Sequence, residues 1–133
     1  MRVPDDERLF RFVEFDDYEE KPGIGGRIRS SLFFTRRHEV SVNLGSIWPL
    51  AQNLAVCPTG YGLCSLTAGE ARSKIRPERG PFDIIPQPVD PDPLLGIHNP
   101  SHANFSRLLH RKEAQGMAEA ASLNIHRVPH EPG

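Results

Sequence analysis

Residues 9–15 read LFRFVEF, and this stretch decides the fold. Side chains alternate between the two faces of a β-strand, so Leu9 and Val13 share one face while Phe10 and Phe12 share the other. Both faces are largely apolar, which is typical of a strand that is covered on both sides. We therefore expect a central strand, with Arg11 in the middle of it among buried neighbours.

Three further stretches predict strands that complete a small, mostly antiparallel sheet within residues 9–67. In one of them Val40 and Val42 alternate with Ser41 and Asn43, so one face is apolar and the other polar. The three stretches are 31–35, 40–44 and 61–67.

Shorter signals lie between these strands. A short helix is expected within residues 45–55, around Trp48, and Thr67 followed by Glu70 three residues later resembles a capping box that starts a helical turn. A glycine-containing stretch after the first strand predicts a flexible loop, and its spacing fits neither GxxxxGK[ST] nor GxGxxG. Its glycines are Gly23, Gly25 and Gly26.

Proline dominates the segment 77–100, which holds seven of the 13 prolines. Each proline ring fixes φ and removes a hydrogen-bond donor, so a helix is excluded there. We expect an extended segment that crosses the surface, with one short strand at 82–85. A stiff connector is the simpler interpretation, and a PxxP-like ligand for an aromatic groove is the alternative.

A helix is predicted over residues 106–122, where Ser106 is a plausible N-cap and residues 124–133 follow as a polar tail. Its apolar residues fall on two opposite sides, so one amphipathic stripe does not fit. Either Gly116 divides the stretch into two helices, or one helix offers its second half to a partner or a second copy of the chain. The first side has Phe105, Leu108 and Leu109, and the second has Ala114, Met117, Ala118 and Ala121.

Length and composition fit one α+β domain over residues 1–133. The chain has 133 residues, of which 38% are hydrophobic and 25% charged, and its mean hydropathy is −0.45. This apolar content is enough for a folded core. The expected architecture consists of the sheet, a proline-rich crossing segment and one or two C-terminal helices.

Charge and cysteine content narrow the possible partners and the compartment. The 16 basic and 17 acidic residues give a net charge of −1, and the basic run 107–112 spreads over a helix surface, so nucleic acid is not an expected partner. No apolar run is long enough to span a bilayer, and Asp5, Asp6 and Glu7 do not suit a signal peptide. With only two cysteines and no disulfide framework, a cytoplasmic location is expected.

Four segments resemble a set of small uncharacterised bacterial proteins that share this order of segments and have no assigned activity. The likeness spans residues 9–105 and implies a compact bacterial domain in which Ser31, Asn43, Arg72 and His102 stand out. An arginine on the first strand and a serine on a later one also resemble ADP-ribosyltransferase-like folds, although the usual glutamate has no counterpart here. The four segments are SSLFF at 30–34, SVN at 41–43, AGEAR at 68–72, and DPL at 92–94 followed by NPSHA at 99–103.

Arg11 is the leading candidate for a site, because an arginine in an apolar strand stays charged and needs an anion. An internal carboxylate is one solution and a ligand is the other. If Arg11 shares a cleft with Ser41, Asn43 and His102, one fixed cation, two hydrogen-bonding groups and one titratable base meet there. The internal carboxylates on offer are Asp16, Asp17, Glu39 and Glu70.

No metal site is predicted. Cys57, Cys64, His98 and His102 could form a Cys₂His₂ set, but the Cys-x₆-Cys spacing is wider than that of structural zinc sites, and Pro100 interrupts the histidine pair. Two buried thiols and two solvent-facing histidines are expected instead, and no particular cofactor is indicated.

Two functions remain open on these patterns. The first is a cytoplasmic bacterial accessory or binding module that recognises a partner protein or an anionic ligand. The second is a small toxin-like transferase that uses a nucleotide or NAD, with His102 and Ser41 as catalytic residues and Arg11, Ser31, Asn43 and Arg72 as ligand-binding residues. The two differ in whether Arg11 and His102 line one concave pocket.

Overall fold

The computed structural model describes residues 2–21, 25–36 and 38–131, and its centre is a six-stranded sheet in which all neighbouring strands are antiparallel. The strand order is β6-β7-β4-β1-β5-β8. The predicted central strand is confirmed as β1, between β4 and β5, and the α+β class is confirmed with it. The strands are β1 (Arg8–Val13), β4 (Ser41–Leu44), β5 (Gly62–Thr67), β6 (Ile84–Pro86), β7 (His102–Phe105) and β8 (Ile125–Arg127).

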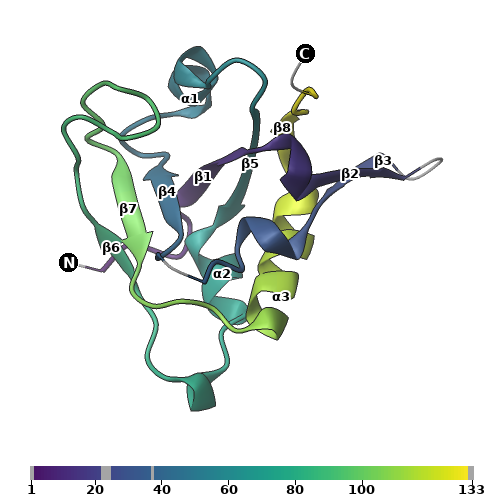
Figure 1. The fold of residues 1–133 in the computed structure, drawn as a ribbon. Coiled ribbons are helices and arrows are strands. Elements are labelled where there is room, and N and C mark those ends of the chain that lie inside the picture. The colour runs from purple at the N-terminus through teal and green to yellow at the C-terminus, as the bar shows by residue number, and fades with distance from the viewer. Residues whose placement is uncertain (1, 22–24, 37, 132–133) are drawn as a thin grey trace.

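The core forms on one face of this sheet, against α2 (Ala68–Ser73) and α3 (Arg111–Ser122). Leu9 of β1 lies opposite Leu44 and Leu66 on the neighbouring strands, and all three are buried. Removal of this apolar surface from water is the main force that stabilises the sheet against the helices. Figure 1 shows α2 and α3 below the sheet and α1 (Leu50–Val56) at the top, away from them.

A hairpin that the sequence did not predict follows β1. After the 3₁₀ turn η1 (Phe15–Asp17), β2 (Tyr18–Lys21) pairs with β3 (Gly25–Ile28) and projects from the body of the molecule (Figure 1). The expected flexible loop is therefore wrong for Gly25 and Gly26, which belong to β3, whereas Gly23 lies outside the described residues. A Cβ at Gly26 would collide with the Tyr18 ring, so the strand needs glycine at this point.

The strand predicted at 31–35 is wrong. Residues Ser30–Leu32 form a 3₁₀ turn, η2, because the Ser30 carbonyl accepts hydrogen bonds from the amides of Phe33 (2.9 Å) and Phe34 (2.8 Å). Leu32 and Phe33 are nevertheless buried, and η2 packs against α3. A turn therefore buries the apolar run that the sequence pattern had assigned to a strand.

The C-terminal helix starts five residues later than predicted. Residues 102–105 are paired to β4 as β7, so the chain has to leave the sheet before α3 can begin at Arg111. Gly116 lies inside one continuous helix and does not divide it.

The alanine and methionine face of α3 is not available to a partner. It packs onto the chain's own η2, β3 and β5, because η2 and the hairpin provide a wall that the sequence did not reveal. The association face proposed from the sequence is corrected accordingly. Its members, Ala114, Met117, Ala118 and Ala121, are all buried.

The proline-rich segment and the C-terminal tail contain more regular structure than the composition suggested. Within 77–100 the chain forms the 3₁₀ turn η3 (Pro77–Arg79), the short strand β6 near its predicted position, and a bridge between Val89 and Asn99. The predicted polar tail is wrong over Ile125–Arg127, which form the edge strand β8.

Helices in the described residues are short. The longest, α3, has 12 residues, whereas a bilayer-spanning helix needs about 20. No described helix is long and apolar enough to cross a membrane.

Candidate functional site

A cleft of about 470 Å³ opens where β1 and β4 diverge. The two strands are paired only at Leu9↔Leu44 and Phe10↔Asn43, so a gap separates them beyond Phe10. Five of the six predicted site residues line this cleft, and only Arg72 does not. The five are Arg11, Ser31, Ser41, Asn43 and His102.

Arg11 occupies the gap between the two strands. Its Nη1 donates to the Ser41 carbonyl at 2.7 Å and its Nε donates to the Leu32 carbonyl at 3.0 Å. Successive carbonyl groups of a strand point alternately to its two neighbouring strands. Asn43 pairs with Phe10 of β1, so the carbonyl of Ser41, two residues earlier in β4, also points toward β1. Because the backbone pairing of β1 and β4 has ended at this point, the Arg11 guanidinium donates to this carbonyl in place of a β1 amide. The Cζ atom of Arg11 lies 6.0 Å from the centroid of the Phe33 ring.

The internal carboxylate expected for Arg11 is not in contact with it. Among the described residues Arg11 forms no ion pair, and its hydrogen-bond acceptors are the two neutral carbonyls. Burial lowers the pKa of Arg11, while the negative charges of Asp17 and Glu14 at longer range oppose this effect. The guanidinium remains charged at any physiological pH, since arginine is not deprotonated in proteins.

Asp17 and Glu14 form an acidic wall of the cleft. The Ser31 hydroxyl donates to Asp17 Oδ1 at 2.7 Å, and the Tyr61 hydroxyl donates to Glu14 Oε1 at 3.0 Å. Burial raises the pKa of Asp17, against the lowering effect of the Ser31 hydrogen bond. Burial together with the bond to Glu14 raises the pKa of Tyr61. The Ser31 hydroxyl therefore serves Asp17 and does not stand free for a ligand.

His102 presents one ring nitrogen as a base. Its Nδ1 lies 2.8 Å from the Gln87 carbonyl oxygen. A carbonyl only accepts hydrogen bonds, so Nδ1 carries the proton and Nε2 of the neutral ring has the free lone pair. In the described part of the chain no protein group hydrogen bonds to Nε2, and the residue is partly buried.

Ser41 and His102 do not form a nucleophile and base pair. In the register of β4 and β7, Ser41 lies opposite Asn104, whereas Asn43 lies opposite His102. The Ser41 hydroxyl donates to Asn104 Oδ1 at 2.9 Å, and the Asn104 amide donates in turn to Gln87 Oε1. Activation of a serine requires a hydrogen bond to its base, so this arrangement leaves Ser41 as a positioning group through its carbonyl.

Asn43 belongs to a buried polar network that anchors the 92–101 loop to the sheet. Its amide donates to Asn53 Oδ1 at 2.9 Å and its oxygen accepts from Asn99 at 2.9 Å. Asn99 also donates to Asp92 Oδ2 at 2.9 Å and accepts from the Ser101 hydroxyl at 2.6 Å. Both the nitrogen and the oxygen of the Asn43 side-chain amide are hydrogen bonded to other residues of the chain. Asn43 therefore holds the wall of the cleft in place and is not free to bind a ligand.

Arg72 lies on α2, apart from the cleft. Its guanidinium contacts Asp5 at 2.6 Å, the Val3 carbonyl at 2.5 Å and Asp83 at 3.7 Å. These contacts connect the N-terminal segment to α2. The structure thus separates Arg72 from the other predicted site residues.

Sequence reasoning missed Glu14 and Tyr61 as lining residues and considered Asp17 only as a partner for Arg11. Glu14 follows β1 directly and Asp17 ends the turn after it, and acidic residues just beyond a central strand were a usable signal. Tyr61 precedes β5 by one residue, and nothing in its local sequence connected it to Glu14.

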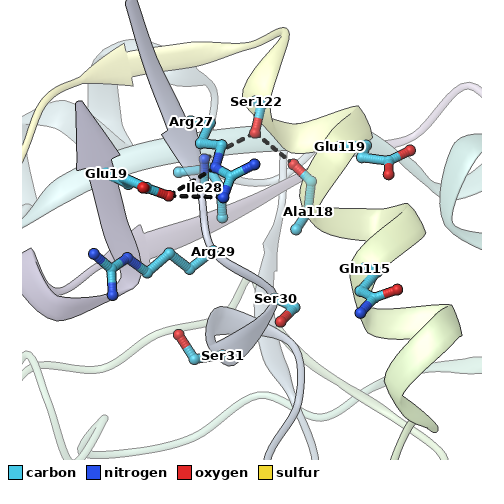
Figure 2. Close-up of a pocket in the computed structure, with 10 residues that line it drawn as sticks. All are labelled: Glu19, Arg27, Ile28, Arg29, Ser30, Ser31, Gln115, Ala118, Glu119 and Ser122. Atoms are coloured by element: carbon cyan, nitrogen blue, oxygen red, sulfur yellow. Dashed lines mark hydrogen bonds and ion pairs between the residues drawn. The ribbon is translucent and has the colours of Figure 1, made fainter. Parts of the chain in front are cut away.

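A second groove of about 760 Å³ lies between the hairpin and α3 (Figure 2). Two of its charged groups are paired with each other, since Arg27 contacts Glu19 at 2.8 Å. The Ser122 hydroxyl accepts from the Ile28 amide and donates to the Ala118 carbonyl. In Figure 2 the Arg29 side chain extends away from α3. The groove therefore lacks a buried cation like Arg11, because Arg27 is paired and Arg29 is exposed.

The described residues contain no group of three or more metal-ligating side chains placed to hold an ion. Cys57 and Cys64 are free, and burial raises the pKa of Cys64 to about 12, so its thiol stays protonated. His98 lies 3.7 Å from Asp90 on the exposed part of the loop.

Comparison of the chain with protein-family models, with curated proteins and with solved structures finds no match. The assignment of a function therefore depends on the geometry of the cleft.

Proposed function

We propose that the protein is a binding module that holds the anionic group of a ligand beside Arg11. The observation that carries the proposal is that this cation faces a cleft and has only neutral carbonyls as direct partners. A partly buried charge without a counter-ion is costly, and an incoming carboxylate or phosphate would reduce that cost.

The arrangement of Arg11 suits this role. Two hydrogen bonds fix the guanidinium before any ligand arrives, so little side-chain entropy is lost on binding. Nη2 has no acceptor in the described part of the chain and remains able to donate. The cleft volume falls within the range of small-molecule sites, roughly 300–1,000 Å³.

The anionic group has two possible sources. It can belong to a free small molecule, or to the C-terminus or a side chain of a partner protein, and Arg11 would meet the same chemistry in both. A bacterial cytoplasmic setting is part of the proposal, and the two unpaired cysteines are consistent with a reducing compartment.

The test is a titration of the protein with acetate, inorganic phosphate, and a short peptide with either a free or an amidated C-terminus. Binding is followed by NMR shifts of the backbone amides around the cleft. Wild-type protein is expected to bind acetate or phosphate with shifts confined to the cleft, and Arg11→Gln is expected to abolish them. Arg29→Gln, an exposed arginine outside the cleft, is the matched control and should bind as wild type does.

Each outcome has a clear meaning. Preference for the free peptide C-terminus over acetate would identify a protein partner, and equal binding would identify a free small anion. Shifts that persist in folded Arg11→Gln, or that spread over the whole surface, would contradict the proposal.

A transferase is the second candidate, and the state of His102 favours it. Its Nε2 is an available base in the cleft that holds Arg11. Incubation with NAD or with nucleotides, followed by chromatography of the products, tests this candidate. Turnover that is lost in His102→Gln would establish it, and unchanged substrates would leave the binding module as the better account.

A further inference from the structure

The cleft carries charges of both signs, and none is neutralised by direct contact. Arg11, Glu14 and Asp17 all line it, and in the described chain no ion pair joins the arginine to either carboxylate. They are close enough for Asp17 and Glu14 to affect the pKa of Arg11. The charges are thus near one another yet separated.

Each of the two carboxylates accepts one side-chain hydrogen bond within the described chain. Asp17 accepts from Ser31 through Oδ1, and Glu14 accepts from Tyr61 through Oε1. No donor among the described residues reaches the second oxygen of either group. Burial, together with the nearby charges of Glu14 and Asp16, raises the pKa of Asp17, so a cation beside this carboxylate would favour its charged form.

The same chain pairs a buried charge elsewhere. Glu113 is fully buried, and Arg107 donates to both of its oxygens at 2.8 Å. Direct pairing is therefore the arrangement at α3, whereas Arg11 and Asp17 are held apart by bonds to Leu32, Ser41 and Ser31. Both residues line the cleft.

We infer that the ligand is a small zwitterion whose anionic group meets Arg11 and whose ammonium group meets Asp17 and Glu14. This inference rests on the proposed function and adds the second half of the ligand. A ligand with one charge of each sign would neutralise both walls, whereas a simple anion at Arg11 would be repelled by the two carboxylates. Free amino acids belong to this chemical class.

The experiment compares amino acids with their matched carboxylates. Glycine, β-alanine and γ-aminobutyrate are titrated against acetate, propionate and butyrate, which lack only the ammonium group. Affinities come from the NMR shifts at the cleft. At least one zwitterion is expected to bind about tenfold more tightly than its carboxylate, which is the typical effect of one added charge contact in a partly buried site.

Asp17→Asn tests the acidic wall. The asparagine can still accept from Ser31, so the fold is expected to persist, but the advantage of the zwitterion should fall to about twofold or less. Affinity for the plain carboxylate should stay the same or rise, because a repulsive charge is gone. Asp16→Asn makes the same charge change at the next residue, which is exposed and does not line the cleft, and should keep the advantage.

Failure of this inference is separable from failure of the proposed function. If carboxylates bind through Arg11 and no amino acid binds more tightly than its partner, the zwitterion is wrong and the anion site stands. An advantage that is equal in Asp17→Asn and wild type would also overturn the inference. If neither series binds at the cleft, both proposals fail.

Discussion

Arg107 and Arg11 are two arginines of the same small fold with opposite surroundings. Arg107 makes a two-pronged contact with Glu113, which also accepts from the amides of Arg76 (2.8 Å) and His110 (2.9 Å). Arg11 donates only to two carbonyls and faces a cleft. A fully paired charge contributes to the fold, while a charge with neutral partners at an opening is available for recognition.

The largest expected effect comes from removing the paired carboxylate. Glu113→Ala leaves Arg107 without its counter-ion and two helix-start amides without their acceptor. We expect a loss of about 3–5 kcal/mol in the free energy of unfolding, measured by urea denaturation. Glu119→Ala, on the exposed side of the same helix, should change it by less than about 0.5 kcal/mol. Similar losses of unfolding free energy in the two variants would mean that the pair of Glu113 and Arg107 does not stabilise the fold.

Acid should weaken the same region. Hydrogen bonds from Arg107, Arg76 and His110 outweigh burial and hold the pKa of Glu113 at about 2, below its ordinary 4.5. Its contribution to stability is therefore complete above pH 4.5 and is lost as the pH falls toward 2. The difference in unfolding free energy between wild type and Glu113→Gln should shrink over this range. A difference that stays constant down to pH 2 would contradict the depressed pKa.

Arg11→Ala should separate binding from stability. Two hydrogen bonds to carbonyls are lost, but water can enter the open cleft and hydrate both acceptors. The expected cost is about 1–2 kcal/mol, smaller than for Glu113→Ala, together with complete loss of anion binding. Chemical denaturation and acetate titration on one preparation check both parts. A loss as large as that of Glu113→Ala would place Arg11 with the structural charges.

The smallest effect is expected for Ser41→Ala. The variant loses one hydroxyl bond to Asn104, while the carbonyl that accepts from Arg11 belongs to the backbone and remains. Stability should fall by about 0.5–1.5 kcal/mol with unchanged acetate affinity. If a transferase reaction is found and Ser41→Ala abolishes it, the serine is a nucleophile after all and the binding module has to be revised.

Local patterns were sufficient for several elements. The capping box at Thr67 is present, with the Thr67 hydroxyl accepting from the Glu70 amide at 3.1 Å and the Glu70 carboxylate accepting from the Thr67 amide at 2.8 Å. All four of these groups lie within one helical turn, so their interaction follows from spacing alone. The apolar side chains on both faces of residues 9–13 similarly predicted a central strand that contains Arg11.

Patterns failed where a distant segment decides the conformation. Residues 31–35 have the apolar character of a strand, but the Ser31 bond to Asp17 and the packing of η2 on α3 favour a turn. The sequence predicted that the alanine face of α3 is open to a partner, because the hairpin that covers this face was not recognised. In both cases the deciding contact comes from a segment remote in sequence.

The sequence by itself determined that this chain forms a central strand with a charged residue in it, because alternation and charge are properties of neighbouring residues. It also identified Arg11, Ser31, Ser41, Asn43 and His102 as candidates. Only the tertiary structure decided that these five share a cleft, that Arg11 meets carbonyls and not a carboxylate, and that Arg72 lies elsewhere. The physical reason is that strand order, and the point at which β1 and β4 diverge, depend on contacts between residues more than thirty positions apart, for which local periodicity carries no information.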